Sequence, residues 1–145
     1  MLALVQRVLE AGVTIDGVRR ADIGQGLLVF VCGQPGDTDE RIDYLAKKVL
    51  KLRIFSDEAG KMNLSVQDIG GEVLVVSQFT LAADTASGNR PSFSSAASPE
   101  EGRRAYERFL LALKAAGVQP QTGEFGADMK VNLVNDGPAT FWLSR

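Results

Sequence analysis

Apolar and β-branched residues come in short runs, separated by small polar turns, over much of this chain. A run of four to eight such residues bounded by turn signals is typical of a strand. Asp16-Gly17 lies between two β-favouring runs, which strongly favours a two-residue hairpin. The runs predicted as strands cover residues 2–8, 13–15, 27–32, 72–77, 129–134 and 139–143, the last two joined by a turn at Asn-Asp-Gly-Pro.

Two other segments place apolar residues at helical spacing. The first helix is expected to begin at residue 37 or 38. The second has clearer boundaries: Ser98 is the N-cap, Pro99 occupies the first helical position, Glu101 completes a capping box, and Gly117 is the predicted stop. The stripes predicted to face the core are Ile42, Leu45, Val49 and Leu52 in the first helix, and Tyr106, Phe109, Leu110 and Leu113 in the second.

The order of these elements is strands, helix, strands, helix, strands, and tight turns join several of the early strands. This order predicts an α+β fold in which a mixed, mostly antiparallel sheet packs against two helices. The length of 145 residues favours a single domain over residues 1–145. The longest polar stretch, residues 83–97, is predicted to be a loop, and loops of this length are often functional.

Composition narrows the chemistry that this fold can perform. The chain has no histidine and one cysteine, so a Ser–His or Cys–His relay and a His-rich metal site are excluded. The formal net charge of −2 argues against broad electrostatic binding of nucleic acid. An enzyme with this composition would rely on backbone groups, hydroxyls, amides or the substrate itself.

Composition also bears on location. No apolar run approaches the roughly 20 residues that span a bilayer. The first residues resemble a strand and not a signal peptide, and a single cysteine forms no internal disulfide. A cytoplasmic location is therefore expected, without a membrane partner.

Residues 77–81 read Ser-Gln-Phe-Thr-Leu and follow the apolar run 73–76. One interpretation is that they are only the polar exit of a buried strand. The functional interpretation is that the exit leaves backbone N–H groups free at Phe79 and Thr80, and oriented N–H groups stabilise an oxyanion. Thr80 as a nucleophile is a weaker hypothesis, because no histidine is present to activate it.

Residues 135–140 read Asn-Asp-Gly-Pro-Ala-Thr. The simple interpretation of Gly137-Pro138 is a turn between two strands. The alternative is a cis peptide bond, which occurs at about 5–6% of X–Pro bonds in folded proteins. A cis bond would aim the carbonyls of Gly137 and Pro138 in nearly the same direction and create a rigid acceptor pair for a small chiral centre.

The remaining candidates are interpreted conservatively. Cys32 ends an apolar strand and is predicted to be a buried, inert thiol. Arg7, Lys51 and Arg53 form either a small anion site or, more simply, a solvated basic fringe. No dinucleotide or phosphate-loop motif is present.

The combination of Ser-Gln-Phe-Thr with Asn-x-Gly-Pro-x-Thr closely resembles the D-aminoacyl-tRNA deacylase family. Further segments resemble the family in the same order, so that the likeness spans essentially the whole chain. These segments are residues 52–55, 60–63, 89–93 and 125–129.

The resemblance implies a hydrolase that removes D-amino acids, and also glycine, from tRNA by cleaving the ester bond to the terminal adenosine. It implies a barrel-like sheet and a homodimer in which Gly137 and Pro138 of one subunit enter the site of the other. It implies that the chemistry uses backbone groups and the 2′-OH of the RNA, without metal or cofactor. Carried over, the catalytic residues are Ser77, Gln78, Phe79 and Thr80, and the substrate-binding residues are Gly137, Pro138, Asn135, Arg7 and Met129.

One segment and one single position depart from the family pattern. Residues 84–88 read Asp-Thr-Ala-Ser-Gly where many relatives carry basic residues beside the glycine, and Ala139 stands where a bulkier residue is common. Two other functions remain as alternatives: a non-enzymatic binder of RNA 3′ ends with Phe79 as a stacking platform, and a purely structural dimer whose motifs are only turns.

Overall fold

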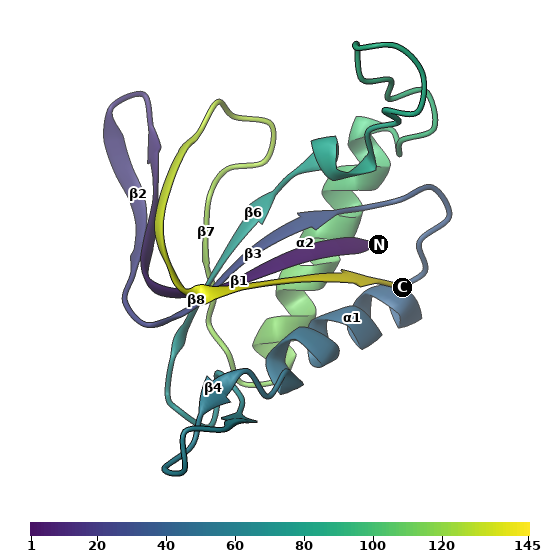
Figure 1. Ribbon diagram of the computed structural model, residues 1–145. Coiled ribbons are helices and arrows are strands. Elements are labelled where there is room, and N and C mark those ends of the chain that lie inside the picture. The colour runs from purple at the N-terminus through teal and green to yellow at the C-terminus, as the bar shows by residue number, and fades with distance from the viewer.

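One long strand, β1 (Leu2–Ile15), organises the sheet in the computed structural model, which describes residues 1–145 (Figure 1). The other elements are β2 (Val18–Ile23), β3 (Gly26–Cys32), α1 (Asp39–Lys51), β4 (Phe55–Ser56), β5 (Met62–Leu64), β6 (Glu72–Ser77), the 3₁₀ helix η1 (Phe79–Ala82), α2 (Pro99–Ala115), β7 (Gln121–Thr122) and β8 (Lys130–Ser144).

The sheet is mixed, as predicted. One edge of β1 pairs antiparallel with β3 and then with β2, and the other edge pairs antiparallel with β8 along nearly its whole length. β6 lies parallel to β3, and β7 lies parallel to β6. Each of these parallel connections contains a helix, as parallel crossovers usually do. The strand order is β2-β1-β3-β6-β7, with β8 outside this path.

The sheet curves until it is nearly barrel-shaped, and side chains bridge the gap between its ends. The amide of Gln121 on β7 accepts from the backbone N–H of Asp22 at 2.7 Å and donates to the carbonyl of Asp22 at 2.8 Å. Glu72 on β6 accepts from the N–H of Gly24 at 3.0 Å. A glutamine side chain therefore replaces the backbone partner that a longer β7 would supply to β2.

The hairpin at Asp16-Gly17 is confirmed. Asp16 has φ 49° and Gly17 has φ 76°, which is the left-handed pair that a two-residue hairpin turn requires. The two strand segments predicted at residues 2–8 and 13–15 form the single strand β1, which carries its irregular pairing with β2 between Val13 and Thr14.

The prediction of a turn between two final strands is wrong. β8 is one continuous strand, and both of its halves pair antiparallel with β1, so the chain does not reverse at Gly137-Pro138. Turn-forming residues here produce a bulge within the strand, since long-range pairing with β1 on both sides outweighs the local turn signal.

Both helices begin where local chemistry predicts. Thr38 caps α1 by accepting from the N–H of Arg41, and Ser98 with Glu101 forms the full capping box of α2. α2 ends in a Schellman motif, in which Val118 N–H bonds the carbonyl of Leu113 and Gly117, at φ 88°, bonds that of Lys114.

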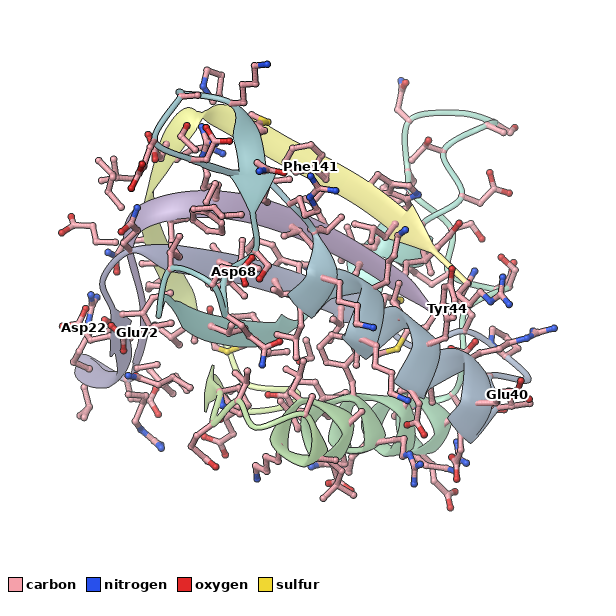
Figure 2. All side chains as sticks on the ribbon, turned by 90° about the horizontal axis from the view of Figure 1, so that it is seen from below. Asp22, Glu40, Tyr44, Asp68, Glu72 and Phe141 are labelled. Atoms are coloured by element: carbon pink, nitrogen blue, oxygen red, sulfur yellow. The ribbon has the colours of Figure 1, made fainter.

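The core has two parts. The larger cluster of 21 buried residues fills the space between one face of the sheet and the two helices, which lie side by side in Figure 2. A smaller cluster of nine residues fills the curved end of the sheet between β1, β2, β3 and β6. Each fully buried Leu, Val or Phe side chain contributes roughly 1.5–3 kcal/mol to folding. No helix of the protein combines the length and apolar character needed to cross a bilayer.

Candidate active site

The exit of β6 places residues 77–80 at the carboxyl end of two parallel strands. Ser77 lies opposite Val31 of β3, and the N–H of Gln78 extends this ladder by donating to the carbonyl of Val31 at 2.8 Å. The chain then turns into η1, whose first bond runs from the N–H of Leu81 to the carbonyl of Gln78 at 3.2 Å.

This turn leaves two backbone donors without partners. The N–H groups of Phe79 and Thr80 donate to no other group of the chain, as is usual for the first turn of a helix. The Thr80 hydroxyl is exposed and accepts from the Gln78 amide. The free donors expected from the sequence are therefore present at the end of β6.

Beside this exit lies a cavity of about 460 Å³, a size typical of small-molecule sites. Eleven of its 19 lining residues are hydrophobic. The walls come from the ends of β3 and β6, from the start of α2 with the loop before it, and from the segment that leads into β8. Among the residues predicted for the site, the cavity gathers Ser77, Gln78, Phe79 and Met129.

Glycines make this arrangement possible. A Cβ on Gly33 would lie 2.7 Å from the Cβ of Ala105, so only glycine lets α2 approach the end of β3. A Cβ on Gly123 would lie 2.4 Å from the sulfur of Met129, so glycine there admits the methionine that lines the cavity.

Two aromatic residues of the cavity wall were not predicted as site residues. Tyr106 on α2 is buried, and its ring lies 5.8 Å from that of Phe125. Burial raises the pKa of the Tyr106 phenol, which therefore stays neutral. The sequence showed Tyr106 only as part of the helical stripe, and it showed Phe125 only within the family-like segment 125–129, without a predicted role at the site.

Cys32 also lines the cavity and confirms the prediction of a buried thiol. Its Sγ donates weakly to the carbonyls of Gly33 at 3.4 Å and Phe79 at 3.6 Å. Burial raises the pKa of the thiol, so the reactive thiolate is disfavoured.

The mouth of the cavity carries an exposed aromatic pair. Phe79 is 62% exposed, and its ring lies 5.0 Å from that of Phe93 in the loop of residues 83–97. Two backbone bonds between Asp84 and Ser92, at 2.8 and 2.9 Å, close this loop at its base. The loop is therefore anchored both by a backbone bridge and by aromatic packing.

Gly137 and Pro138 lie outside the cavity of their own chain. Gln6 pairs with Thr140 and Val8 pairs with Asn135, so residues 136–139 lie opposite Arg7 alone and bulge out of the ladder. Both Gly137 and Pro138 are exposed, and the peptide bond between them is cis. Gly137 has φ 145°, and a Cβ there would lie 2.9 Å from the N of Ala139 and 3.0 Å from Nη2 of Arg7, so the bulge requires glycine.

Arg7 and Asn135 hold this bulge in place. Arg7 is 11% exposed, and its guanidinium donates to the carbonyls of Asp136 at 2.9 Å and Ile54 at 2.5 Å. The Asn135 oxygen accepts from Ala139 N–H at 2.7 Å, and its amide donates to the Thr140 hydroxyl at 3.0 Å. Neither residue lines the cavity, so within one chain both act on the shape of the bulge.

The other basic residues of the predicted fringe do not gather around Arg7. Arg53 donates to the backbone and side-chain oxygens of Asn63 on the β4–β5 hairpin. Lys51 is exposed at the end of α1. These contacts favour the interpretation of a solvated fringe over that of an anion site.

Comparison with known proteins shows the family of this chain. The family model described as D-Tyr-tRNA(Tyr) deacylase matches residues 4–144. A D-aminoacyl-tRNA deacylase of Ruegeria pomeroyi is 64% identical over 143 residues, with 99% of each chain covered. One of Paracoccus denitrificans is 62% identical over 143 residues, covering 99% of this chain and 96% of the relative.

Solved structures also match the fold. One titled c-Myc DNA Unwinding Element Binding Protein superposes with a TM-score of 0.93 at 40% identity, covering 100% of this chain and 99% of the other. Another, titled as a structural analysis of a probable eukaryotic D-amino acid tRNA deacylase, has a TM-score of 0.84 at 17% identity, with 98% and 97% covered, and shows the likeness of fold alone.

Proposed function

Because this chain belongs to the D-Tyr-tRNA(Tyr) deacylase family and is a hydrolase of the ester bond of D-aminoacyl-tRNA, we propose that its cavity binds the aminoacylated 3′ end and that a second copy of the chain completes the site. One observation carries this proposal. The cavity with the free N–H donors at its edge and the bulge of Gly137-Pro138 are separate features of one protomer. A homodimer in which each bulge enters the cavity of the partner brings them together.

The reaction in this site is hydrolysis of an activated ester. A water oxygen attacks the carbonyl carbon, the negative charge develops on the carbonyl oxygen, and the bond to the 3′-oxygen of the terminal adenosine breaks. The leaving 3′-oxygen takes up a proton from the neighbouring 2′-OH, and the attacking water returns one of its protons to that hydroxyl. The N–H groups of Phe79 and Thr80 stabilise the oxyanion, and removal of one such donor from an enzyme typically costs 10²–10³ in rate.

Side chains have only supporting roles in this mechanism. Ser77 and Gln78 line the cavity beside the free donors, and the Thr80 hydroxyl accepts from the Gln78 amide. Cys32 and Tyr106 stay protonated because burial raises the pKa of each. The site needs no metal or other cofactor, since the ester is already activated and the donors are backbone groups.

Chiral selection in this proposal is steric. The carbonyls of Gly137 and Pro138 from the partner accept hydrogen bonds from the α-amino group of the substrate. Gly137 has no side chain, and Arg7 and Asn135 keep the bulge rigid. With the amino group and carbonyl fixed, the D side chain points out of the site and an L side chain collides with the bulge. Glycine has no side chain to collide, so glycyl-tRNA mischarged on tRNA(Ala) is a second substrate.

The sheet has an apolar face suited to the homodimer. Leu4 of β1 lies directly between Phe30 of β3 and Trp142 of β8, and all three face away from the helices. Trp142 is 54% exposed, and the outer edge of β8 has no strand beside it. Exposed apolar faces and free strand edges favour association. A twofold arrangement uses the same face of both copies.

The proposed location is the cytoplasm, where aminoacyl-tRNA occurs. The test is deacylation of D-Tyr-tRNA and L-Tyr-tRNA by the purified protein, with and without a metal chelator. We expect rapid loss of the D ester alone, unaffected by chelator. Glycyl-tRNA(Ala) is expected to behave like the D ester. Equal rates for the D and L esters would contradict steric selection, and loss of activity with chelator would contradict the metal-free mechanism.

A binder of RNA 3′ ends without turnover is the alternative, and the exposed Phe79–Phe93 pair is the observation that favours it. Hydrolysis of many substrate molecules per protein excludes this alternative. Stoichiometric binding of the 3′ end with no hydrolysis of either ester would establish it.

A further inference from the structure

The helix α2 carries Arg103, Arg104 and Arg108, and their contacts differ. Arg104 pairs with Asp39 of α1 at 2.5 Å, and Arg108 pairs with Asp43 at 2.6 Å. Arg103 makes no ion pair, and its guanidinium lies 4.7 Å from the centre of the Phe125 ring. Two of these arginines therefore join the helices, whereas the third lies against the wall of the cavity.

The charge of Arg103 is not neutralised by the acids around the cavity. Glu101 accepts from the backbone and hydroxyl of Ser98 in the capping box. Asp128 pairs with Lys130 at 3.0 Å. Glu100 and Glu107, one turn before and after Arg103, form no ion pair. Arg103 is also exposed, so an incoming anion has access to it.

The five N–H groups of Arg103 are free, because its guanidinium forms no ion pair and no side-chain hydrogen bond and lies over the ring of Phe125. Those groups match the oxygens of a phosphate in a bidentate pair. Phe125 lines the cavity and packs against Tyr106, so Arg103 is held on a fixed part of the wall.

We infer that Arg103 binds the phosphate that joins the terminal adenosine of the tRNA to the nucleotide before it. The inference rests on the proposed function, in which the adenosine occupies the cavity. That phosphate is then the charged group nearest to the cavity mouth. The chain as a whole is acidic, with a net charge of −2, so a phosphate there needs a local cation.

The experiment compares two substrates, D-Tyr-tRNA and 3′-O-(D-tyrosyl)adenosine, which has the ester but no phosphate. In Arg103→Gln we expect kcat/KM for D-Tyr-tRNA to fall about three- to fivefold, the size of one exposed ion pair. The slope of log kcat/KM against log salt should become shallower by about 0.7, one phosphate on a single strand. The rate with the tyrosyl adenosine should not change.

Arg104→Gln is the matched control, because it removes the same charge from the next position of the same helix. It should leave the D-Tyr-tRNA rate and its salt slope at the wild-type values. Arg103→Lys keeps the charge without the planar fork and should restore the salt slope, with kcat/KM between those of wild type and Arg103→Gln.

Equal losses with both substrates would overturn the inference and make Arg103 only a support for Phe125. An unchanged rate and salt slope with D-Tyr-tRNA would also overturn it. These results differ from failure of the proposed function, in which the wild-type protein hydrolyses neither substrate.

Discussion

The cavity at the end of β6 and the bulge of β8 differ in shape and in what holds them. The cavity is concave and mostly apolar, and packing of α2, β3 and the segment before β8 defines it. The bulge is convex and exposed, and hydrogen bonds from Arg7 and Asn135 define it. The free N–H groups of Phe79 and Thr80 lie at the cavity, whereas the bulge is exposed and encloses no space.

In the proposed function, this difference separates the two tasks of the enzyme. Stabilisation of an oxyanion requires only fixed N–H groups, which a strand end supplies through its backbone. Discrimination between mirror images requires a rigid wall close to the α-carbon, and in the proposed function the braced glycine-proline bulge is that wall. In the homodimer proposed above, assembly from two protomers would let each feature be supported by its own kind of contact. The predictions below test this division, beginning with the largest expected effect.

Replacement of the Thr80 amide by an ester, through the α-hydroxy acid analogue of threonine, removes one free N–H and keeps the side chain. We expect kcat for D-Tyr-tRNA to fall about 10²–10³-fold, as for loss of one oxyanion donor. Thr80→Ala keeps the N–H and is the control, which should retain most of the activity. Single-turnover deacylation with circular dichroism to confirm folding measures both. A near-total loss in Thr80→Ala with folding intact would instead make Thr80 a nucleophile.

Gly137→Ala places a Cβ against Ala139 and Arg7 at a φ that disfavours any side chain. Displacement of the bulge should lower kcat/KM for D-Tyr-tRNA by about 100-fold, the cost of a misplaced positioning group. Gly36→Ala is the control, because Gly36 has φ 76° but nothing within 4 Å of its Cβ position. Its activity should stay at the wild-type level.

The same variant tests whether the site is shared. Ala97→Trp fills the cavity and should be inactive alone. Equal mixtures of Gly137→Ala and Ala97→Trp, unfolded and refolded together, should recover about a quarter of wild-type activity, because half of the dimers are mixed and each contains one intact site. No recovery in a mixture shown to exchange subunits would place the cavity and bulge of one protomer in one site.

Features set by neighbouring residues could be predicted from the sequence. The hairpin at Asp16-Gly17, the capping box of Ser98 and the stop at Gly117 depend on contacts within a few residues, and all three are present. The exit of β6 with its free donors follows from the same local logic, since a strand that turns into a short helix leaves its first N–H groups unpaired.

Features set by distant contacts could not be predicted. The signal at Gly137-Pro138 correctly marked a break in regular pairing, but the path of the chain there depends on β1, more than 120 residues away. The contact between Tyr106 and Phe125 in the cavity wall joins a helical stripe to the family-like segment 125–129, and neither pattern shows that the two rings meet. β7, a strand of two residues completed by the side chain of Gln121, carried no periodic signal at all.

Arg7→Gln tests whether the brace is needed for selectivity. The buried guanidinium joins the bulge to Ile54, and glutamine is too short to make both contacts. We expect kcat/KM for D-Tyr-tRNA to fall about tenfold, less than for a direct change in the bulge, and the ratio of D to L rates to fall with it. Arg19→Gln is the control, since Arg19 also bonds a β8 residue, Asn132, away from the bulge. Loss of thermal stability with an unchanged D-to-L ratio would leave Arg7 a purely structural role.

Asp43→Asn changes the contact between α1 and α2, which belongs to neither the cavity nor the bulge. The hydrogen bonds of Arg108 hold the pKa of the Asp43 carboxyl below its ordinary value. A carboxyl whose pKa is lowered by folding stabilises the protein above its unfolded pKa of about 3.9, and this contribution disappears as the pH falls through the folded value. Urea unfolding should therefore show the variant less stable than wild type at pH 7, with the difference closing below about pH 4. Glu58→Gln, at an exposed carboxyl without an ion pair, is the control and should unfold like wild type at pH 7. The Asp43–Arg108 pair joins α1 to α2 and touches neither the cavity nor the bulge. Both variants should therefore keep the wild-type ratio of D to L rates. A change in that ratio would mean that the cavity and the bulge depend on the packing of the two helices.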